Sequence, residues 1–156
     1  TTKIMLLNRK TIAKLAKELK ENGKNLVFTN GCFDIIHSGH IKYLTEARKL
    51  GDYLIVGLNS DSSVKILKGV ERPINNEEDR AAVLCGLKAV DFVTIFEEET
   101  PAELIREIIP NVLVKGGDYT VETIVGADTV QNNGGKVIII PFVEGKSTTR
   151  IINKMK

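Results

Sequence analysis

Five short apolar segments alternate along the chain with segments that have the residue spacing of amphipathic helices. They are hydrophobic almost throughout rather than at every second residue, and they are NLVFT (25–29), YLIVGL (53–58), DFVTIF (91–96), NVLVK (111–115) and KVIII (136–140). Strands with this composition are buried on both faces, as in parallel sheets that helices cover on both sides. The pattern therefore predicts an α/β fold with an open, mainly five-stranded parallel sheet.

Helices are expected where apolar residues recur three or four positions apart. This spacing, with glycine and proline boundary signals, predicts helices over 10–22, 38–50, 77–89, 101–108 and 147–156, and a weaker one over 121–132. Residues 59–75 are polar with turn signals at Gly69 and Pro73, so we expect a loop there. The 156 residues show no internal repeat, low-complexity segment or linker, which predicts a single domain over 1–156.

Charge and hydropathy narrow the classes of partner. The net charge is +2, which is too small to favour nucleic acid or a membrane surface as the main partner. No apolar run approaches the roughly 18 residues that a membrane-spanning helix needs, and the N-terminal residues lack a signal-peptide pattern. Cys32 and Cys85 lie in apolar surroundings and make no disulfide framework. We therefore expect a cytoplasmic protein with buried free thiols.

Polar clusters fall at the ends of predicted strands, at 30–40, 59–72, 115–118 and 144–149. The carboxyl ends of parallel strands meet along one edge of a sheet, and ligands bind at that edge near the point where the strand order reverses. We therefore expect these four clusters to surround one binding site.

The first cluster lies in TNGCFDIIHSGH (29–40), which contains both histidines of the chain. His37 and His40 are three residues apart, so both rings face the same side of a helix that starts at about Ser38. The free N–H groups and the positive dipole end of a helix start bind anions, and two imidazoles there can donate to phosphate oxygens. A carboxylate suits an anion site poorly, so Asp34 is expected to orient a base, a lysine or a magnesium ion.

Two simpler interpretations of the histidine pair stay open. One is a zinc site, although the chain has no third histidine to complete the ligand set. The other is ordinary helix capping by Ser38, with histidines that have no function. The pattern G-x-x-x-x-G-K-[ST] is absent, no G-x-G-x-x-G follows the first strand, and no G-x-S-x-G occurs. Phosphate binding here would therefore use neither a P-loop nor a Rossmann dinucleotide-binding motif.

TNGCFDIIHSGH, with its HSGH tetrapeptide, resembles the signature of the cytidylyltransferase-like nucleotidyltransferases. The resemblance extends over nearly the whole chain to the adenylyltransferase domain of the bacterial heptose synthases, in the segments ARKLGDYLIVGLNSD, LKGVERPI, EEDRAAVL, AVDFVTIFEEETP, LVKGGDY, IVGAD and EGKSTTRII. It implies a Rossmann-like nucleotidyltransferase fold with helices on both faces of the sheet. It also implies transfer of AMP from ATP to D-glycero-D-manno-heptose 1-phosphate, which gives ADP-heptose and pyrophosphate for lipopolysaccharide or surface glycans.

The resemblance assigns roles to individual residues. It implies that His37 and His40 bind the triphosphate, and that Lys68, or Lys65 in its place, reaches the α-phosphate and the acceptor phosphate. Arg72 is implied to meet the sugar phosphate. The nucleotide is implied to contact Thr29, Asn30, Gly31, Cys32, Phe33, Asp34, Arg80, Gly116, Gly117, Asp118, Ser147, Thr148 and Thr149. The last three open the final helix, where hydroxyl groups can both cap the helix and bind phosphate.

The same resemblance implies partners and leaves alternatives. ATP and a sugar 1-phosphate are the expected substrates, and Mg²⁺ is expected through the nucleotide phosphates, with no protein ligand assigned. Because 156 residues cannot also hold a sugar kinase, the chain is expected to be either a stand-alone enzyme with a separate sugar kinase upstream or an excised domain of a bifunctional protein. A homodimer is expected because relatives are often dimers. A cytidylyltransferase that uses glycerol 3-phosphate or another phosphorylated alcohol stays an alternative, as does a non-catalytic nucleotide-binding module.

Overall fold

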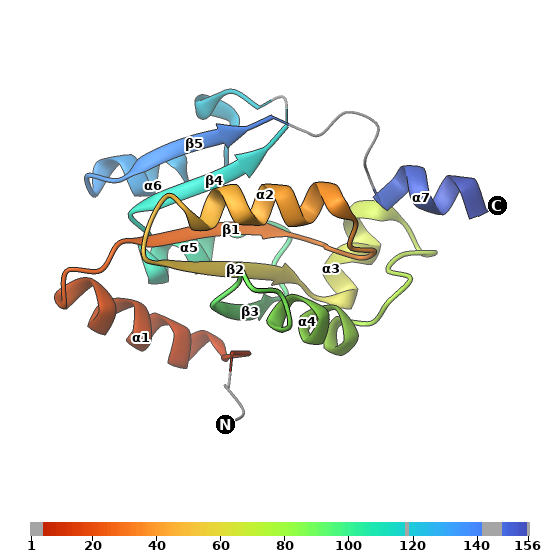
Figure 1. The fold of residues 1–156 in the computed structure, drawn as a ribbon, viewed down its shortest axis with the longest axis horizontal. Coiled ribbons are helices and arrows are strands. Elements are labelled where there is room, and N and C mark those ends of the chain that lie inside the picture. Colours follow the sequence, from red (N-terminus) through yellow and green to blue (C-terminus); the bar gives the residue numbers. More distant parts are fainter. Residues whose placement is uncertain (1–4, 118, 142–147, 156) are drawn as a thin grey trace.

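The computed structural model describes residues 5–117, 119–141 and 148–155 of the chain (Figure 1). Its centre is a five-stranded sheet in which all neighbouring strands are parallel, in the order β3-β2-β1-β4-β5. The strands are β1 (Leu26–Gly31), β2 (Tyr53–Asn59), β3 (Phe92–Phe96), β4 (Val112–Gly116) and β5 (Lys136–Ile140). Each lies within a residue or two of a predicted apolar segment, so the parallel α/β sheet expected from the sequence is confirmed.

Helices cover both faces of this sheet. They are α1 (Arg9–Glu21), α2 (Ser38–Arg48), α3 (Asp61–Lys68), α4 (Glu77–Cys85), α5 (Ala102–Ile108), α6 (Ala127–Asn132) and α7 (Thr148–Met155), with a 3-10 turn η1 at Val121–Thr123. Buried residues of α1, α5 and α6 pack with Phe28 and Leu113 on one face, and those of α2 and α4 pack with Val27 on the other. No helix within the described ranges is long and apolar enough to cross a membrane.

The strand order reverses between β1 and β4. The chain continues from β1 outward to β2 and β3, and then returns to place β4 and β5 on the other side of β1. Pairing with β2 extends along all of β1, whereas pairing with β4 is confined to Val27–Val112 and Phe28–Leu113. The carboxyl ends of β1 and β4 are thus free to flank a ligand, which is the usual position for one in an open α/β sheet.

Three segments differ from the predicted helices and loops. Residues 61–68, expected as part of a loop, form α3, and Ser60 caps this helix by accepting the N–H of Ser63 at 3.2 Å. The helix predicted over 121–132 is divided into η1 and α6, because Gly126 between them has a φ of +90°, a left-handed value that a continuous helix does not contain. The helix predicted to reach residue 89 ends at Cys85, just before a glycine.

Candidate active site

A cavity of about 1110 Å³ lies at the carboxyl ends of the strands. Many of the predicted site residues line it, namely Asn30, Gly31, Cys32, Phe33, Asp34, His37, His40, Lys68, Arg72, Gly116 and Thr149. Segments far apart in the sequence, which come from β1, α2, α3, β4 and α7, thus meet at one site. A smaller cavity of about 500 Å³ lies beside η1 and α6 and contains none of these residues, so we place the candidate site in the larger one.

Both histidines take part in the cap of α2. Nδ1 of His37 accepts the backbone N–H of Gly39 at 3.1 Å, and Nδ1 of His40 accepts the backbone N–H of His37 at 3.2 Å. The N-cap residue is therefore His37, and the interpretation that Ser38 caps the helix is wrong. The two rings stack with their centroids 3.9 Å apart. Because each Nδ1 is an acceptor, a neutral ring carries its proton on Nε2.

Burial keeps His40 neutral at physiological pH. Desolvation, and then the charge of the neighbouring His37, lower the pKa of His40 to about 4. Its Nε2–H is thus an uncharged hydrogen-bond donor. The start of α2 adds the positive end of a helix dipole at the same place. Together they make the start of α2 suitable for an anion.

The backbone between β1 and α2 has an unusual conformation at one residue. Phe33 has a φ of +45°, in the left-handed region that aromatic residues rarely occupy. Its ring is almost buried, with its centroid 5.4 Å from that of His40. A Cβ on Gly31 would come within 2.9 Å of this ring, so glycine leaves the space that the ring fills. Strain of this kind is concentrated at functional sites, and here it positions the ring that packs on His40.

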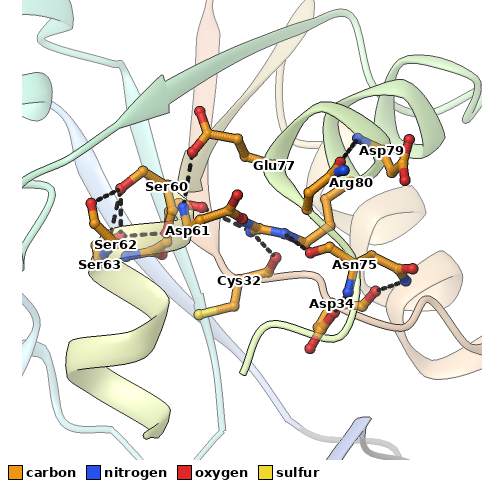
Figure 2. Close-up of polar contacts among 12 residues, drawn as sticks. Cys32, Asp34, Ser60, Asp61, Ser62, Ser63, Asn75, Glu77, Asp79 and Arg80 are labelled. Carbon is orange, nitrogen blue, oxygen red and sulfur yellow. Dashed lines mark hydrogen bonds and ion pairs between the residues drawn. The ribbon is translucent and has the colours of Figure 1, made fainter. Parts of the chain in front are cut away.

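Arg80, which was expected to bind phosphate, does not line the cavity. Its side chain is 0% exposed. Its guanidinium donates to the carbonyl oxygens of Cys32 and Asn59 at 2.8 Å and of Asn75 at 3.0 Å, and to Oδ1 of Asp61 at 2.8 Å. Figure 2 shows the Arg80 side chain among Cys32, Asp61 and Asn75. These bonds use four of the five N–H groups of a guanidinium. The geometry therefore makes Arg80 a residue that ties the loops after β1 and β2 to α4.

Asp34 is likewise enclosed by protein donors. Its carboxylate accepts the N–H groups of Ile74 and Asn75, both at 2.8 Å, and Nε of Arg72 at 2.9 Å. Burial alone would raise the pKa of Asp34, but the bonds from Asn75, Ile74 and Arg72 outweigh it and lower the pKa below its ordinary value. Asp34 thus anchors the loop over 72–75 beside the cavity. Arg72, which was expected to meet the sugar phosphate, is held by this carboxylate while it lines the cavity.

The two candidate lysines of α3 are placed differently. Lys68 is the last residue of the helix and lines the cavity, whereas Lys65 lies one turn earlier and does not. Gly69 follows with a φ of +104°, a conformation that favours glycine, and ends the helix there. Among the described residues, no hydrogen bond or ion pair engages the ammonium group of Lys68. Of these two lysines, the geometry favours Lys68 as a ligand contact.

The side chains of Thr29 and Cys32 face different surroundings. Thr29 is fully buried, and its hydroxyl lies 2.6 Å from that of Tyr43, so it joins β1 to α2 and does not line the cavity. The Thr29 side chain, which was predicted to contact the nucleotide, therefore lies behind the cavity wall. Cys32 does line the cavity, and burial raises the pKa of its thiol. A protonated thiol is a weak nucleophile, which fits a cavity-wall residue.

The remaining predicted contacts follow β4 and open α7. Gly116 ends β4 at the cavity, and Gly117 after it has a φ of +105°. Asp118 and Ser147 lie outside the described residues. Thr148 is the first residue of α7, and Thr149 beside it is exposed and lines the cavity.

Lys115 and Tyr119 line the cavity. Lys115 falls in the predicted polar cluster 115–118, but the sequence assigned no role to either residue. Lys115 is the penultimate residue of β4, and its ammonium group lies 5.4 Å from the centroid of the Tyr119 ring. The available signal was the charge itself, because Lys115 ends an otherwise apolar strand at the carboxyl edge of the sheet. A charged residue at that position is costly to bury unless it has a partner.

The geometry of the histidine pair also bears on the zinc interpretation. Both Nδ1 atoms already accept backbone N–H groups, and coordination through either would remove a cap of α2. Nowhere in residues 5–117, 119–141 and 148–155 do three or more His, Cys, Asp or Glu side chains form a group that could hold a metal ion. The described cavity lining carries the cations Lys68, Arg72 and Lys115 besides the carboxylates Glu46 and Glu99, and the hydrogen-bond donors at the start of α2 suit an anionic ligand.

Comparison with known proteins gives close relatives. The model of the family described as Cytidylyltransferase-like matches residues 28–154. The bifunctional protein HldE of Geotalea uraniireducens is 56% identical over 149 residues, which are 96% of this chain and 30% of that protein. HldE of Wolinella succinogenes is 56% identical over 151 residues, which are 97% of this chain and 31% of that protein. The chain therefore spans about 30% of the length of the curated relatives it matches.

Two solved structures have a similar fold. The lipopolysaccharide core biosynthesis protein from Thermoplasma volcanium is 31% identical with a TM-score of 0.63, over 80% of this chain and 100% of that chain. Pantoate-beta-alanine ligase from Francisella tularensis has a TM-score of 0.61 over 97% of this chain and 77% of that chain. At 15% identity, the ligase shows similarity of fold alone. The family match runs from the middle of β1 to α7 and so covers every element that contributes to the cavity, and this chain belongs to the cytidylyltransferase-like family.

Proposed function

We propose that the chain is a nucleotidyltransferase that transfers AMP from ATP to D-glycero-D-manno-heptose 1-phosphate. The observation that carries the proposal is the convergence of the His37–His40 pair at the start of α2 with Lys68 on one cavity. The choice of ATP and heptose phosphate is supported by the resemblance of the KGGDY and STT segments to the adenylyltransferase domain of heptose synthases. The HldE relatives, at 56% identity, support the same choice.

The geometry suggests how these residues would act. A phosphate oxygen of the acceptor attacks the α-phosphorus of ATP, and the new P–O bond forms as the bond to the β-phosphate breaks and its electron pair leaves with pyrophosphate. His40 would donate from Nε2 to a triphosphate oxygen, and Lys68 would balance charge on the α-phosphate in the transition state. No covalent enzyme intermediate is required, so catalysis here is positioning and charge stabilisation.

Arg80 and Asp34 have a positioning role in this proposal. Arg80 joins the loops that carry Cys32 and Asn59, and Asp34 holds the segment 72–75. Mg²⁺ would enter bound to the phosphates of ATP, as it commonly does. Both oxygens of Asp34 already accept protein donors, so Asp34 is a poor ligand for that ion.

The setting of the reaction is part of the proposal. The acceptor carries a phosphate at its anomeric carbon, so a kinase reaction must precede this step, and we expect a sugar kinase activity to supply it. We also expect a homodimer and a cytoplasmic location, with ADP-heptose used for lipopolysaccharide or surface glycans. Light scattering of the purified protein tests the dimer.

A panel of nucleotides and acceptors, scored by pyrophosphate release, tests the proposed substrates. We expect turnover with ATP and heptose 1-phosphate, and little with CTP. Turnover with CTP and glycerol 3-phosphate, but not with ATP and heptose phosphate, would instead establish the cytidylyltransferase alternative.

A substitution at His40 tests the role of the histidine pair. The variant His40→Asn keeps a side-chain acceptor for the capped N–H group and removes the imidazole donor. We expect kcat to fall by about 100- to 1000-fold, the usual loss for one donor aimed at developing charge. Unchanged pyrophosphate release in this variant, with binding of ATP retained, would contradict the assignment of His40.

A further inference from the structure

Lys115 lies on the opposite face of the sheet from the histidine pair. Residues of a strand alternate between faces, and Leu113 two positions earlier packs in the cluster with α1, α5 and α6. The ammonium-bearing side chain therefore starts on that face, while α2 and its histidines cover the other. Both faces reach the same cavity because β1 and β4 do not pair beyond Phe28 and Leu113.

The charge of Lys115 has no counter-ion in the described part of the chain. No hydrogen bond or ion pair of its ammonium group is present there, and its one polar contact is the face of the Tyr119 ring. Burial, together with the nearby charge of Lys68, lowers the pKa of Lys115, while Cys32 acts in the opposite direction. Lys115 is partly buried, and an ammonium group that has no partner among the described residues costs stability, which favours a role in binding a ligand.

Lys20 shows how the same protein satisfies a half-buried lysine. Burial also lowers the pKa of Lys20, but its ammonium group donates to the carbonyl oxygens of Ile108 at 2.8 Å and Ile109 at 3.0 Å. Those acceptors stand at the end of α5, where a cation is favourable. Lys115 lines the cavity, and its ammonium group has no such acceptors among the described residues. The difference indicates that the acceptor for Lys115 arrives with a ligand.

We propose that Lys115 binds the phosphate of the sugar-phosphate acceptor, with Lys68 as the second cation on the same phosphate. The inference rests on the proposed function and assigns a residue to its acceptor subsite. The two lysines lie near each other beside Cys32. A phosphate monoester carries up to two negative charges, which two lysines without carboxylate partners would match.

The in-line geometry of phosphoryl transfer favours the acceptor over ATP as the ligand of Lys115. The attacking and leaving oxygens lie on opposite sides of the α-phosphorus. If the histidines hold the leaving pyrophosphate, the acceptor must approach from the side away from them. Lys115 comes from the sheet face opposite to α2, so its charge is placed where the attacking phosphate would arrive.

The variant Lys115→Met tests this inference, with Lys136→Met as the matched control. Lys136 is exposed and lies at the opposite end of the neighbouring strand β5. We expect the KM for the sugar 1-phosphate to rise by about 10- to 100-fold in Lys115→Met, the range for one charged hydrogen bond. The KM for ATP should stay within about threefold, and neither constant should change in the control. The Tm of Lys115→Met should be unchanged or higher, because a partly buried charge is removed.

Two results would overturn the assignment of Lys115. A rise in the KM for ATP with an unchanged KM for the sugar phosphate would assign Lys115 to the nucleotide. Unchanged constants together with a lower Tm would make it a structural residue. Lys115→Gln, which keeps a polar side chain, gives the same comparison if the methionine variant does not fold. Absence of any turnover by the wild type with sugar 1-phosphates would overturn the proposed function itself, before the variants are compared.

Discussion

Two pairs of basic side chains lie in or beside the cavity, and the protein treats them differently. Arg72 and Arg80 have carboxylate partners, Asp34 and Asp61, at 2.9 and 2.8 Å. Lys68 and Lys115 have no carboxylate partner among the described residues. Protein acceptors therefore surround the two guanidinium groups more closely than the two ammonium groups.

The difference separates support from binding. A guanidinium has five donors in a fixed plane, so one Arg80 can join three carbonyl groups and a carboxylate that belong to separate loops. A lysine left without a counter-ion gains most when a ligand supplies the negative charge. We infer that the arginine pair maintains the shape of the cavity and the lysine pair contacts what enters it.

The largest expected effect comes from removing the most enclosed arginine. Arg80→Met would leave three carbonyl groups and Asp61 without their donor, and we expect a loss of about 3–5 kcal/mol in the free energy of unfolding. Chemical denaturation measures it. Arg106→Met is the control, because Arg106 pairs with Glu103 on the surface with both side chains more than half exposed, and such a pair contributes about 0–1 kcal/mol. Equal losses in both variants would contradict the comparison.

The lysine pair should behave in the opposite way. Lys68→Met is expected to lower kcat/KM by about 100- to 1000-fold through loss of charge stabilisation, with the midpoint of denaturation unchanged. Steady-state pyrophosphate release measures the first quantity. Lys14→Met, on the exposed face of α1, serves as the control for general loss of positive charge. An equally large loss in Lys65→Met with full activity in Lys68→Met would reverse the assignment of the two lysines in α3.

The smallest expected effect concerns the histidine pair and the pH dependence of stability. The pKa of His40 is lowered to about 4 in the folded protein, whereas an unfolded chain takes up the proton near the ordinary pKa of about 6.5. The unfolded state thus binds more protons between these values, so stability falls as the pH drops from 6.5 toward 4. Melting temperatures at pH 7, 6 and 5 measure this, and His40→Asn should reduce the slope. An unaltered slope in that variant would show that other groups govern it.

The strands and the helix start at the histidine pair could be predicted from the sequence because both leave local signals. Burial on both faces makes a strand apolar throughout, and a glycine-flanked histidine pair after a strand marks a helix start. The position of Arg80 left no local signal, since its four acceptors come from Cys32, Asn59, Asp61 and Asn75, which only the folded chain brings together. α3 was not predicted, because the polar residues of its first turn have the composition of a loop and the N-cap Ser60 does not stand out among them.

The short pairing between β1 and β4 has a consequence for how a bound ligand would affect the local stability of the sheet. Within the five-stranded sheet, the strands β3-β2-β1 and the strands β4-β5 pair with each other at Val27–Val112 and Phe28–Leu113. We call this junction the seam. A ligand that contacts His40 on one side and Lys115 on the other would connect the two sides of that seam. A ligand that binds only when β1 and β4 are paired stabilises the paired arrangement by mass action. We therefore expect hydrogen–deuterium exchange to slow on both sides of the seam, in β1 and β4 together, when both substrates are bound.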